Sequence, residues 1–571
     1  MAVNIEKYVH ILGANTISQL ITYLGIVFVG ALAFFAILEY PFVSLGYIGA
    51  SALPALFIIN IIGAAIVALA FVTVPAIVKK ENIERNFPVF MAYLGAMTTS
   101  KSNYEEFFKA LADTEEYGEI SKEMKRLYHL AKDWKLGYAR ACKVVADTTP
   151  SPLFSNFLAR LSQVVEYGED IETFFKNQYG DIMRDMQTQY QQAAYKITTV
   201  AELFSALFVA VAFLLAFAVM LPLFFPISNE MIEIGTAVVL LFVDALLLAL
   251  SRTSVPIDDF VPPFTKGSQE HFMAVVAAWI GVIASLLAFV ILYILQVDPI
   301  WQVALSAIPL VVPAYIASQA ESIIRTREET YIPFIRTFGD LVAIREGAIT
   351  PVLKRLRRHI YKGMNEAMDR LYRRLAITRQ VFHAFDLFSR ELGSAMIAKF
   401  NEMFIRALYL GADPKKTGEI IGDQMHAIMD SRKLRLQIAG GAKGIMYGTY
   451  WGVALGVFIA VMALAQMFSM FAAVFSGLQG QVGNYLGGLF NLTVDITPLV
   501  GFMVYVFAAE AAIIAITIKI LDGGLLSGST KHYIILIIGL VIVYFMTKGI
   551  VQMLFPSAES IAGAAAPKIA P

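Results

Sequence analysis

The stretch from Ile445 to Phe475, IMYGTYWGVALGVFIAVMALAQMFSMFAAVF, is 31 residues long and contains no charged side chain. About 20 predominantly apolar residues are enough for a helix to cross a lipid bilayer, so this stretch predicts a membrane-spanning helix. The residues just before it, DQMHAIMDSRKLRLQIAGGAK at 423–443, are polar and also helical in pattern. A helix that leaves a polar domain and runs directly into the membrane is therefore the unit from which we predict the fold.

The composition of the whole chain agrees with a membrane protein. Of its 571 residues, 58% are hydrophobic and only 16% are charged, and the mean hydropathy is +0.65. An average soluble domain has about 25% charged residues. The single cysteine, Cys142, excludes an intrachain disulfide and a cysteine-based metal site. We expect no metal and no other cofactor.

Nine segments are long and apolar enough to be membrane spans. The sixth is the weakest, because it is short and contains Pro309 and Pro313. We expect the first to be a retained anchor helix and not a cleaved signal peptide, since no small-residue cleavage site follows a compact apolar run. The nine segments are 21–38, 53–77, 203–225, 234–250, 272–295, 300–316, 445–475, 499–520 and 533–555.

Basic residues predict the orientation, because Lys and Arg concentrate on the cytoplasmic side of a membrane protein. The polar stretches 78–200 and 317–443 hold 16 and 22 of the 45 Lys and Arg residues, while the loops 40–52, 226–231, 296–299 and 476–496 hold none. Nine crossings with a cytoplasmic N-terminus and an external C-terminus satisfy this distribution. In this topology both polar stretches lie in the cytoplasm.

The two polar stretches read as copies of one all-helical unit. FPVFMAYLGAM at 87–97 aligns with IPFIRTFGDLV at 332–342, and glycine-containing turns follow at 166–170 and 409–413. Near-equal spacing of such landmarks favours duplication over chance similarity of two helical bundles. We therefore predict an all-α polytopic protein with two duplicated cytoplasmic helical bundles. Its parts are membrane helices at 1–77, 201–320 and 444–571, and cytoplasmic domains at 78–200 and 321–443.

The second cytoplasmic domain carries a strong positive charge. It holds 22 basic and 14 acidic residues, a net of +8, whereas the first holds 16 and 17. Many of the basic residues lie between Lys354 and Arg379, where apolar residues from Leu353 to Leu375 recur at helical spacing and predict one continuous helix. Such a face could lie near anionic lipid headgroups or dock an acidic protein partner. Nucleic acid is not indicated, since no binding motif accompanies the charge. The docking candidates are Lys354, Arg355, Arg358, Lys362, Arg370, Arg373 and Arg374.

A glycine ladder opens the seventh span. Glycine recurs at every fourth position, so one helix face has almost no side chains. In a membrane such a face lets another backbone approach closely. The other backbone could belong to the same chain, to a second copy in a homodimer, or to a partner's membrane helix. The candidate residues for this seam are Gly444, Gly448, Gly452 and Gly456, with Gly440 before them.

Two carboxylic acids, Asp244 and Glu510, lie inside predicted spans, where ionisable groups are costly. Two carboxylates on separate helices do not make a traceable proton relay, and we expect each to make a structural hydrogen bond to a neighbouring helix. The chain has no phosphate-binding loop, nucleophile elbow or dinucleotide-binding motif, so no catalytic residue is proposed. Asn491, in Asn-Leu-Thr at 491–493, is a possible glycosylation site in a predicted external loop.

These features together resemble the GspF/PilC superfamily of platform proteins, which contains the type II secretion F domain. The motif residues are Phe90-Met-Ala-Tyr-Leu94 and Val165-Glu-Tyr-Gly168, with looser matches at 334–338 and 408–411. Two copies would cover about 88–215 and 333–465. The nine spans and large cytoplasmic copies are most similar to the J-type assembly proteins of the archaellum, the archaeal flagellum, which would make this an archaeal cell-membrane protein.

This resemblance implies a non-catalytic platform with no cofactor. In the family, a hexameric secretion ATPase docks on the cytoplasmic face, and the platform helps to assemble pilin-like subunits, here archaellin, into a filament. The resemblance places the ATPase contact on the basic helix, with the membrane-proximal end of the first copy as a second surface, and makes the glycine ladder a candidate homodimer seam. The alternatives are a platform for another archaeal pilus or type II-like secretion system, and a polytopic transporter.

Overall fold

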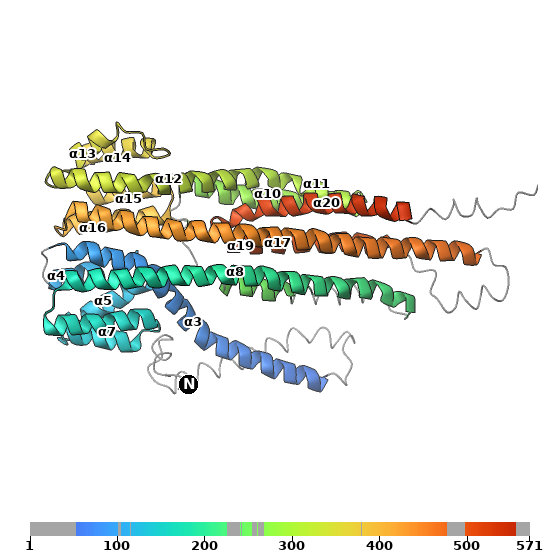
Figure 1. The fold of residues 1–571 in the computed structure, drawn as a ribbon, viewed down its shortest axis with the longest axis horizontal. Helices are drawn as coiled ribbons and strands as arrows, with labels where there is room; N and C mark the ends of the chain where they lie inside the picture. Colours follow the sequence, from blue (N-terminus) through green and yellow to red (C-terminus); the bar gives the residue numbers. More distant parts are fainter. Residues whose placement is uncertain are drawn as a thin grey trace, which may run out of the picture. The chain divides into compact units, whose positions relative to one another are not determined.

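The computed structural model of the chain describes residues 53–100, 104–114, 116–224, 240, 243–253, 260, 268–378, 380–476 and 497–554. Every regular element in these ranges is a helix (Figure 1). The all-α prediction is therefore confirmed.

The first copy consists of a long helix, four short helices and a second long helix. These are α3 (Leu53–Thr98), α4 (Tyr104–Ala112), α5 (Glu119–Lys132), α6 (Tyr138–Thr148), α7 (Pro152–Tyr167) and α8 (Ile171–Phe224). The second copy repeats this order with α12 (Val311–Ile344), α13 (Ile349–Leu356), α14 (Asn365–Thr378), α15 (Val381–Leu392), α16 (Ala395–Tyr409) and α17 (Pro414–Ser476). This agreement in order and length is what the predicted duplication requires. Pro88 and Pro333 lie inside the first long helix of their copies.

The same local chemistry sets the helix boundaries in both copies. Gly168 and Gly411 adopt left-handed conformations, with φ of 68° and 77°, just before α8 and α17. Only glycine takes this conformation readily, so each short helix ends there. Ser151 and Ser394 accept hydrogen bonds from backbone N–H groups at the starts of α7 and α16. Both serines also donate to a glutamate of the preceding long helix, Ser151 to Glu84 and Ser394 to Glu328.

Six helical stretches are long and apolar enough to cross a membrane: 195–217, 269–294, 299–344, 414–467, 500–522 and 526–554. They correspond to the third, fifth, sixth, seventh, eighth and ninth predicted spans. The sixth is among them although its helix is interrupted: α11 (Pro299–Ser306) and the short 3-10 helix η3 (Ile308–Leu310) precede α12. The first predicted span and about half of the fourth lie outside the described residues, so the number nine stays a prediction. The other spans are α10 (Gln269–Ile294), α19 (Thr497–Asp522) and α20 (Ser529–Leu554), with the 3-10 helix η4 (Leu526–Gly528) before α20.

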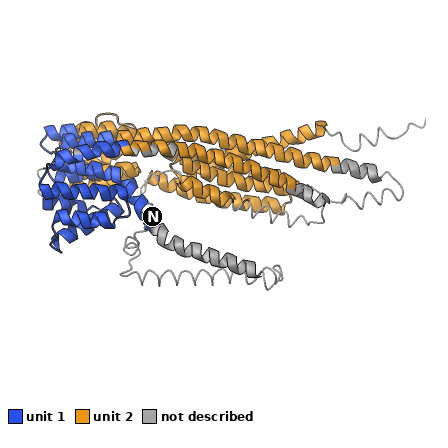
Figure 2. Cartoon of the chain, turned by 60° about the horizontal axis from the view of Figure 1, so that its bottom comes forward, with its two compact units in different colours: residues 1–184, 339–347, 403–424 blue, residues 185–338, 348–402, 425–571 orange. Residues whose placement is uncertain are grey.

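The chain divides into two compact units (Figure 2). Unit 1 contains residues 1–184, 339–347 and 403–424, and unit 2 contains the rest. Within unit 1, the segment 403–424 of the second copy packs on helices of the first. The Tyr179 hydroxyl donates to Gln424 at 2.6 Å, and Lys416 lies 3.2 Å from Glu172.

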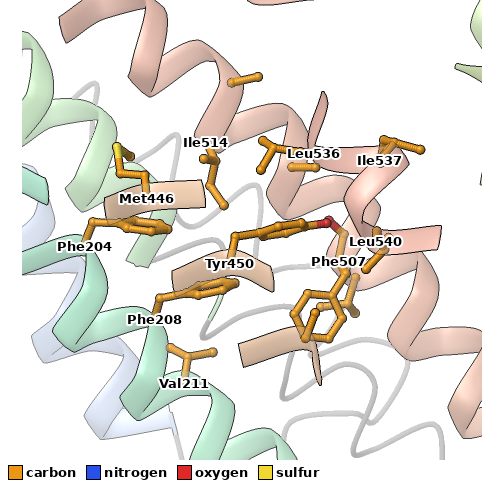
Figure 3. Close-up of a cluster of buried hydrophobic side chains, with 14 of the residues drawn as sticks. Phe204, Phe208, Val211, Met446, Tyr450, Phe507, Ile514, Leu536, Ile537 and Leu540 are labelled. Atoms are coloured by element: carbon orange, nitrogen blue, oxygen red, sulfur yellow. The ribbon is translucent and has the colours of Figure 1, made fainter. Parts of the chain in front are cut away.

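The core of unit 2 joins the membrane-spanning parts of α8, α17, α19 and α20. Figure 3 shows Phe204 and Phe208 of α8 next to Tyr450 of α17 and Phe507 of α19. The Tyr450 ring is fully buried, and its hydroxyl donates to the Phe507 carbonyl at 2.8 Å. A buried hydroxyl needs such a partner, so this bond fixes the contact between α17 and α19.

Candidate functional site: a basic surface above the membrane helices

The basic stretch of the second copy forms two helices and not the single predicted one. α13 ends at Leu356 and α14 begins at Asn365, and Gly363 between them has a φ of 79°. The apolar stripe from Leu353 to Leu375 is buried except for Ile360, which lies in the turn and is 90% exposed. The prediction of one helix was wrong because this left-handed glycine breaks it without changing the apolar spacing.

The seven docking candidates fall into two groups. Arg370 and Arg374 form ion pairs with Glu391 of α15, the first at 3.0 Å. The other five are exposed, and within the described part of the chain they have neither an ion pair nor a side-chain hydrogen bond. We call this group the basic surface; it comprises Lys354, Arg355, Arg358, Lys362 and Arg373.

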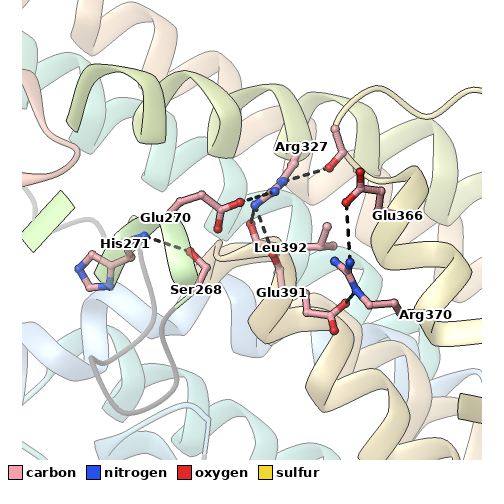
Figure 4. A network of polar contacts seen from close by, with 9 residues as sticks. Ser268, Glu270, His271, Arg327, Glu366, Arg370, Glu391 and Leu392 are labelled. Atoms are coloured by element: carbon pink, nitrogen blue, oxygen red, sulfur yellow. Dashed lines mark hydrogen bonds and ion pairs between the residues drawn. The ribbon is translucent and has the colours of Figure 1, made fainter. Parts of the chain in front are cut away.

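A polar junction connects the helices that carry the basic surface to a membrane helix (Figure 4). Its centre is Arg327 of α12, whose side chain is 13% exposed. The guanidinium Nη2 lies 2.6 Å from Glu270 in the first turn of α10, and Nη1 donates to the carbonyls of Glu391 and Leu392 at 3.2 and 3.0 Å. Nε donates to the carbonyl of Gly363 at 3.0 Å. One side chain thus ties together α10, the end of α15 and the turn between α13 and α14.

The charges at this junction suit the helix ends they face. Arg327 binds carbonyls at the C-terminus of α15, and Glu270 lies at the N-terminus of α10, which is the favourable placement for each charge. Gly393 ends α15 with a φ of 72°, and Ser268 caps α10. A Cβ at Gly393 would collide with the Ser268 side chain. These two helix ends therefore lie in direct contact.

The glycine ladder of α17 faces open space. At Gly444, Gly448, Gly452 and Gly456 an added Cβ would have no described atom within 4 Å, and the same is true at Gly440. All five glycines are exposed. The opposite side of α17 is packed, as Tyr450 shows. No described part of the chain covers the ladder.

Asp244 and Glu510, which the sequence placed on separate helices, lie close enough for their side chains to interact. Both are buried, with exposed fractions of 7% and 4%. The structural hydrogen bond that we expect for each acid stays a prediction.

The remaining sequence predictions concern metal binding, the cysteine and the glycosylation site. No group of three or more His, Cys, Asp or Glu side chains there is placed to hold a metal ion. Cys142 is buried and unpaired, and burial raises the pKa of its thiol to about 12. Asn491 and the side chain of Arg379 lie outside the described residues.

Residues 90–219 match the family model of the type II secretion system protein F. The first copy, from Phe90 in α3 to the membrane part of α8, is therefore similar to the protein F domain, over a range close to the predicted 88–215.

Two archaeal relatives extend this similarity beyond the F domain. Flagella accessory protein J of Methanocaldococcus jannaschii is 27% identical over 549 residues, which cover 93% of each chain. Flagella accessory protein J of Methanococcus voltae is 23% identical over 471 residues, covering 80% of this chain and 83% of the relative. No solved structure matches the chain significantly. The predicted resemblance is confirmed.

The family match and the basic surface lie in different copies. The F domain match ends at residue 219, whereas the basic surface begins at Lys354. The second copy repeats the helix order of the F domain but adds the positive charge and the Arg327 junction. Sequence reasoning found the charge and missed the junction. The one sequence feature that indicated this junction was Glu270, an acidic residue in the first turn of a membrane span.

Proposed function

We propose that this chain is a multi-pass membrane platform for assembly of an archaellum or a related type IV pilus-like filament, and that it has no catalytic role of its own. The observation that carries this proposal is the F domain together with similarity to two flagella accessory J proteins along most of the chain. Platforms for another archaeal pilus or a type II-like secretion system use the same kind of domain and are the alternative.

In this proposal, the basic surface docks a hexameric secretion ATPase on the cytoplasmic side. Five exposed cations without a carboxylate partner in the described part of the chain favour an acidic partner, because complementary charge speeds the encounter and fixes its register. Arg370 and Arg374 have a different role: their ion pairs with Glu391 hold α14 against α15. Charge reversal should therefore target the five and leave these two unchanged.

The Arg327 junction would carry the effect of docking into the membrane. It joins the turn beside the basic surface to the first turn of α10, so a displacement of α13 and α14 acts directly on a membrane helix. The exposed glycine ladder supports a homodimer, and pilin-like subunits would contact the membrane helices. The orientation, with a cytoplasmic N-terminus and an external C-terminus, follows from the distribution of Lys and Arg.

The experiment that tests the platform role is deletion of the gene in its host, with filaments counted by electron microscopy. The proposal expects loss of the surface filament and its restoration by the intact gene. Filaments in normal number after deletion would contradict it. Restoration by a variant with Arg355, Arg358 and Lys362 all changed to Glu would remove the basic surface from the mechanism.

A further inference from the structure

A small cavity in unit 2 lies where two membrane spans meet the second copy. Its volume is about 60 Å³. One water molecule needs about 10–15 Å³ of such space, so the cavity has room for roughly four waters or one phosphate group. Four basic side chains line it: Arg325, Arg432, Lys433 and Arg435.

The arginines of this cavity are held in fixed positions. The guanidinium carbons of Arg325 and Arg432 lie 5.6 and 5.9 Å from the centre of the Phe260 ring, within cation–π distance. Arg435 donates to the carbonyls of Leu521 and Ile520 at 2.9 and 2.8 Å, at the end of α19. Guanidinium groups held in place lose little conformational freedom when they bind an anion.

The cavity has an excess of positive charge. Of its three acidic lining residues, Glu328 is paired with Arg432 and Asp522 with Lys443, both at 2.8 Å. The third is Glu329. In the described part of the chain, neither Arg325 nor Lys433 forms an ion pair. With Lys443 included, five cations surround three carboxylates.

The cavity lies at the ends of membrane spans. The glycine turn 523–524, which forms one wall, separates the spans 500–522 and 526–554. Arg435 of α17 binds the end of the span 500–522 through the carbonyls of Ile520 and Leu521. Met429, Leu436 and Phe260 add apolar walls. This is the level of lipid headgroups, and basic pockets between membrane helices on the cytoplasmic side are sites for anionic headgroups.

We propose that this cavity binds the phosphate of an anionic lipid headgroup. Arg325 and Lys433 contact the phosphate oxygens, Arg432 and Arg435 provide fixed positive charge behind them, and the apolar wall receives the glycerol end of the headgroup. The site does not depend on the proposed platform role. It gives the second copy a lipid contact separate from the basic surface.

The test uses the full-length protein in detergent, with the thermal unfolding midpoint followed as lipid is added. Phosphatidylglycerol should raise the midpoint by several degrees, while phosphatidylcholine should not. The double variant R325Q/K433Q should need at least tenfold more phosphatidylglycerol for the same shift. The charge-conserving variant R325K/K433R should behave like the wild type, which separates lost binding from misfolding. The matched control K354Q/R355Q, on the basic surface, should keep the full response.

Three results would overturn the proposal. Equal stabilisation by phosphatidylcholine would show that the headgroup charge is irrelevant. An unchanged response of R325Q/K433Q would place the lipid elsewhere. Reproduction of the shift by millimolar inorganic phosphate without lipid would make the cavity a site for a soluble anion.

Discussion

Replacement of Gly448 and Gly452 by Leu should separate two copies of the chain without harming either. In the structure an added Cβ at each position meets no described atom within 4 Å. A glycine in a helix interior costs about 1 kcal/mol relative to a good helix former, so the change should stabilise the single chain by about 1–2 kcal/mol. If no other part of the same chain covers the ladder, the thermal stability of the variant should therefore be unchanged or higher.

At a dimer seam the same change has the opposite effect. Small-residue faces associate because the two backbones come close, and a large side chain prevents that approach. Overpacking typically costs about 1–3 kcal/mol per site. Two sites therefore weaken the dimer by about 2 kcal/mol or more, which is roughly thirtyfold in dissociation constant.

Fluorescence energy transfer between donor- and acceptor-labelled copies in liposomes, measured over a range of protein-to-lipid ratios, reports the dimer. G448L/G452L should require about thirtyfold higher density for half-maximal transfer, with an unchanged or raised unfolding midpoint. Gly539 of α20 provides the control, because a Cβ there would collide with the Trp451 indole. G539A should lower the midpoint and leave energy transfer intact. If the ladder variant instead dimerises normally and loses stability, the ladder packs within its own chain.

Three further predictions concern single contacts. R327A should lower the free energy of unfolding by about 2–4 kcal/mol, because it leaves Glu270 without its cation. An unchanged thermal midpoint would show that the Arg327 contacts do not stabilise the protein. D244N and E510Q should fold normally, since a neutral amide of the same size fills the same buried space. E510A should cost about 1–3 kcal/mol, also read from the midpoint, because it leaves the buried Asp244 without its polar neighbour; equal effects of E510Q and E510A would rule out a polar role for Glu510. Cys142 should resist maleimide at neutral pH, because its thiol is buried and protonated, and it should react once the protein is unfolded in SDS. The mass of the product reports the labelling, and rapid labelling of the folded protein would show that the thiol is accessible.

The membrane spans and the duplication could be predicted because both depend on local signals. Span length follows from counts of apolar residues, and the copies were visible in glycine and proline landmarks such as Gly168 and Gly411. The break in the basic helix could not be predicted from periodicity. Met364 and Leu353 are three helical turns apart and both buried, so the apolar pattern continues across the turn that contains Gly363.

Contacts between distant residues were the main part of the site that the sequence did not reveal. Asp244 and Glu510 are 266 positions apart, and nothing near either residue indicates that their side chains meet. Arg327 was one of 22 basic residues in its stretch and was distinguished only by burial and by its four partners. Such pairings depend on how the helices pack, which local composition does not determine.

Co-purification of a hexameric ATPase from native membranes is the most direct test of the central claim. The wild-type chain should retain the ATPase, and R355E/R358E/K362E should lose it while still inserting into the membrane. Exposed ion pairs are worth up to about 1 kcal/mol each, and three reversals that also add repulsion should weaken binding by about 3 kcal/mol, or more than a hundredfold. The matched control K125E/R140E/K143E, with the same charge change on exposed residues of the first copy, should retain the ATPase. Equal retention by both triple variants would contradict docking on the basic surface.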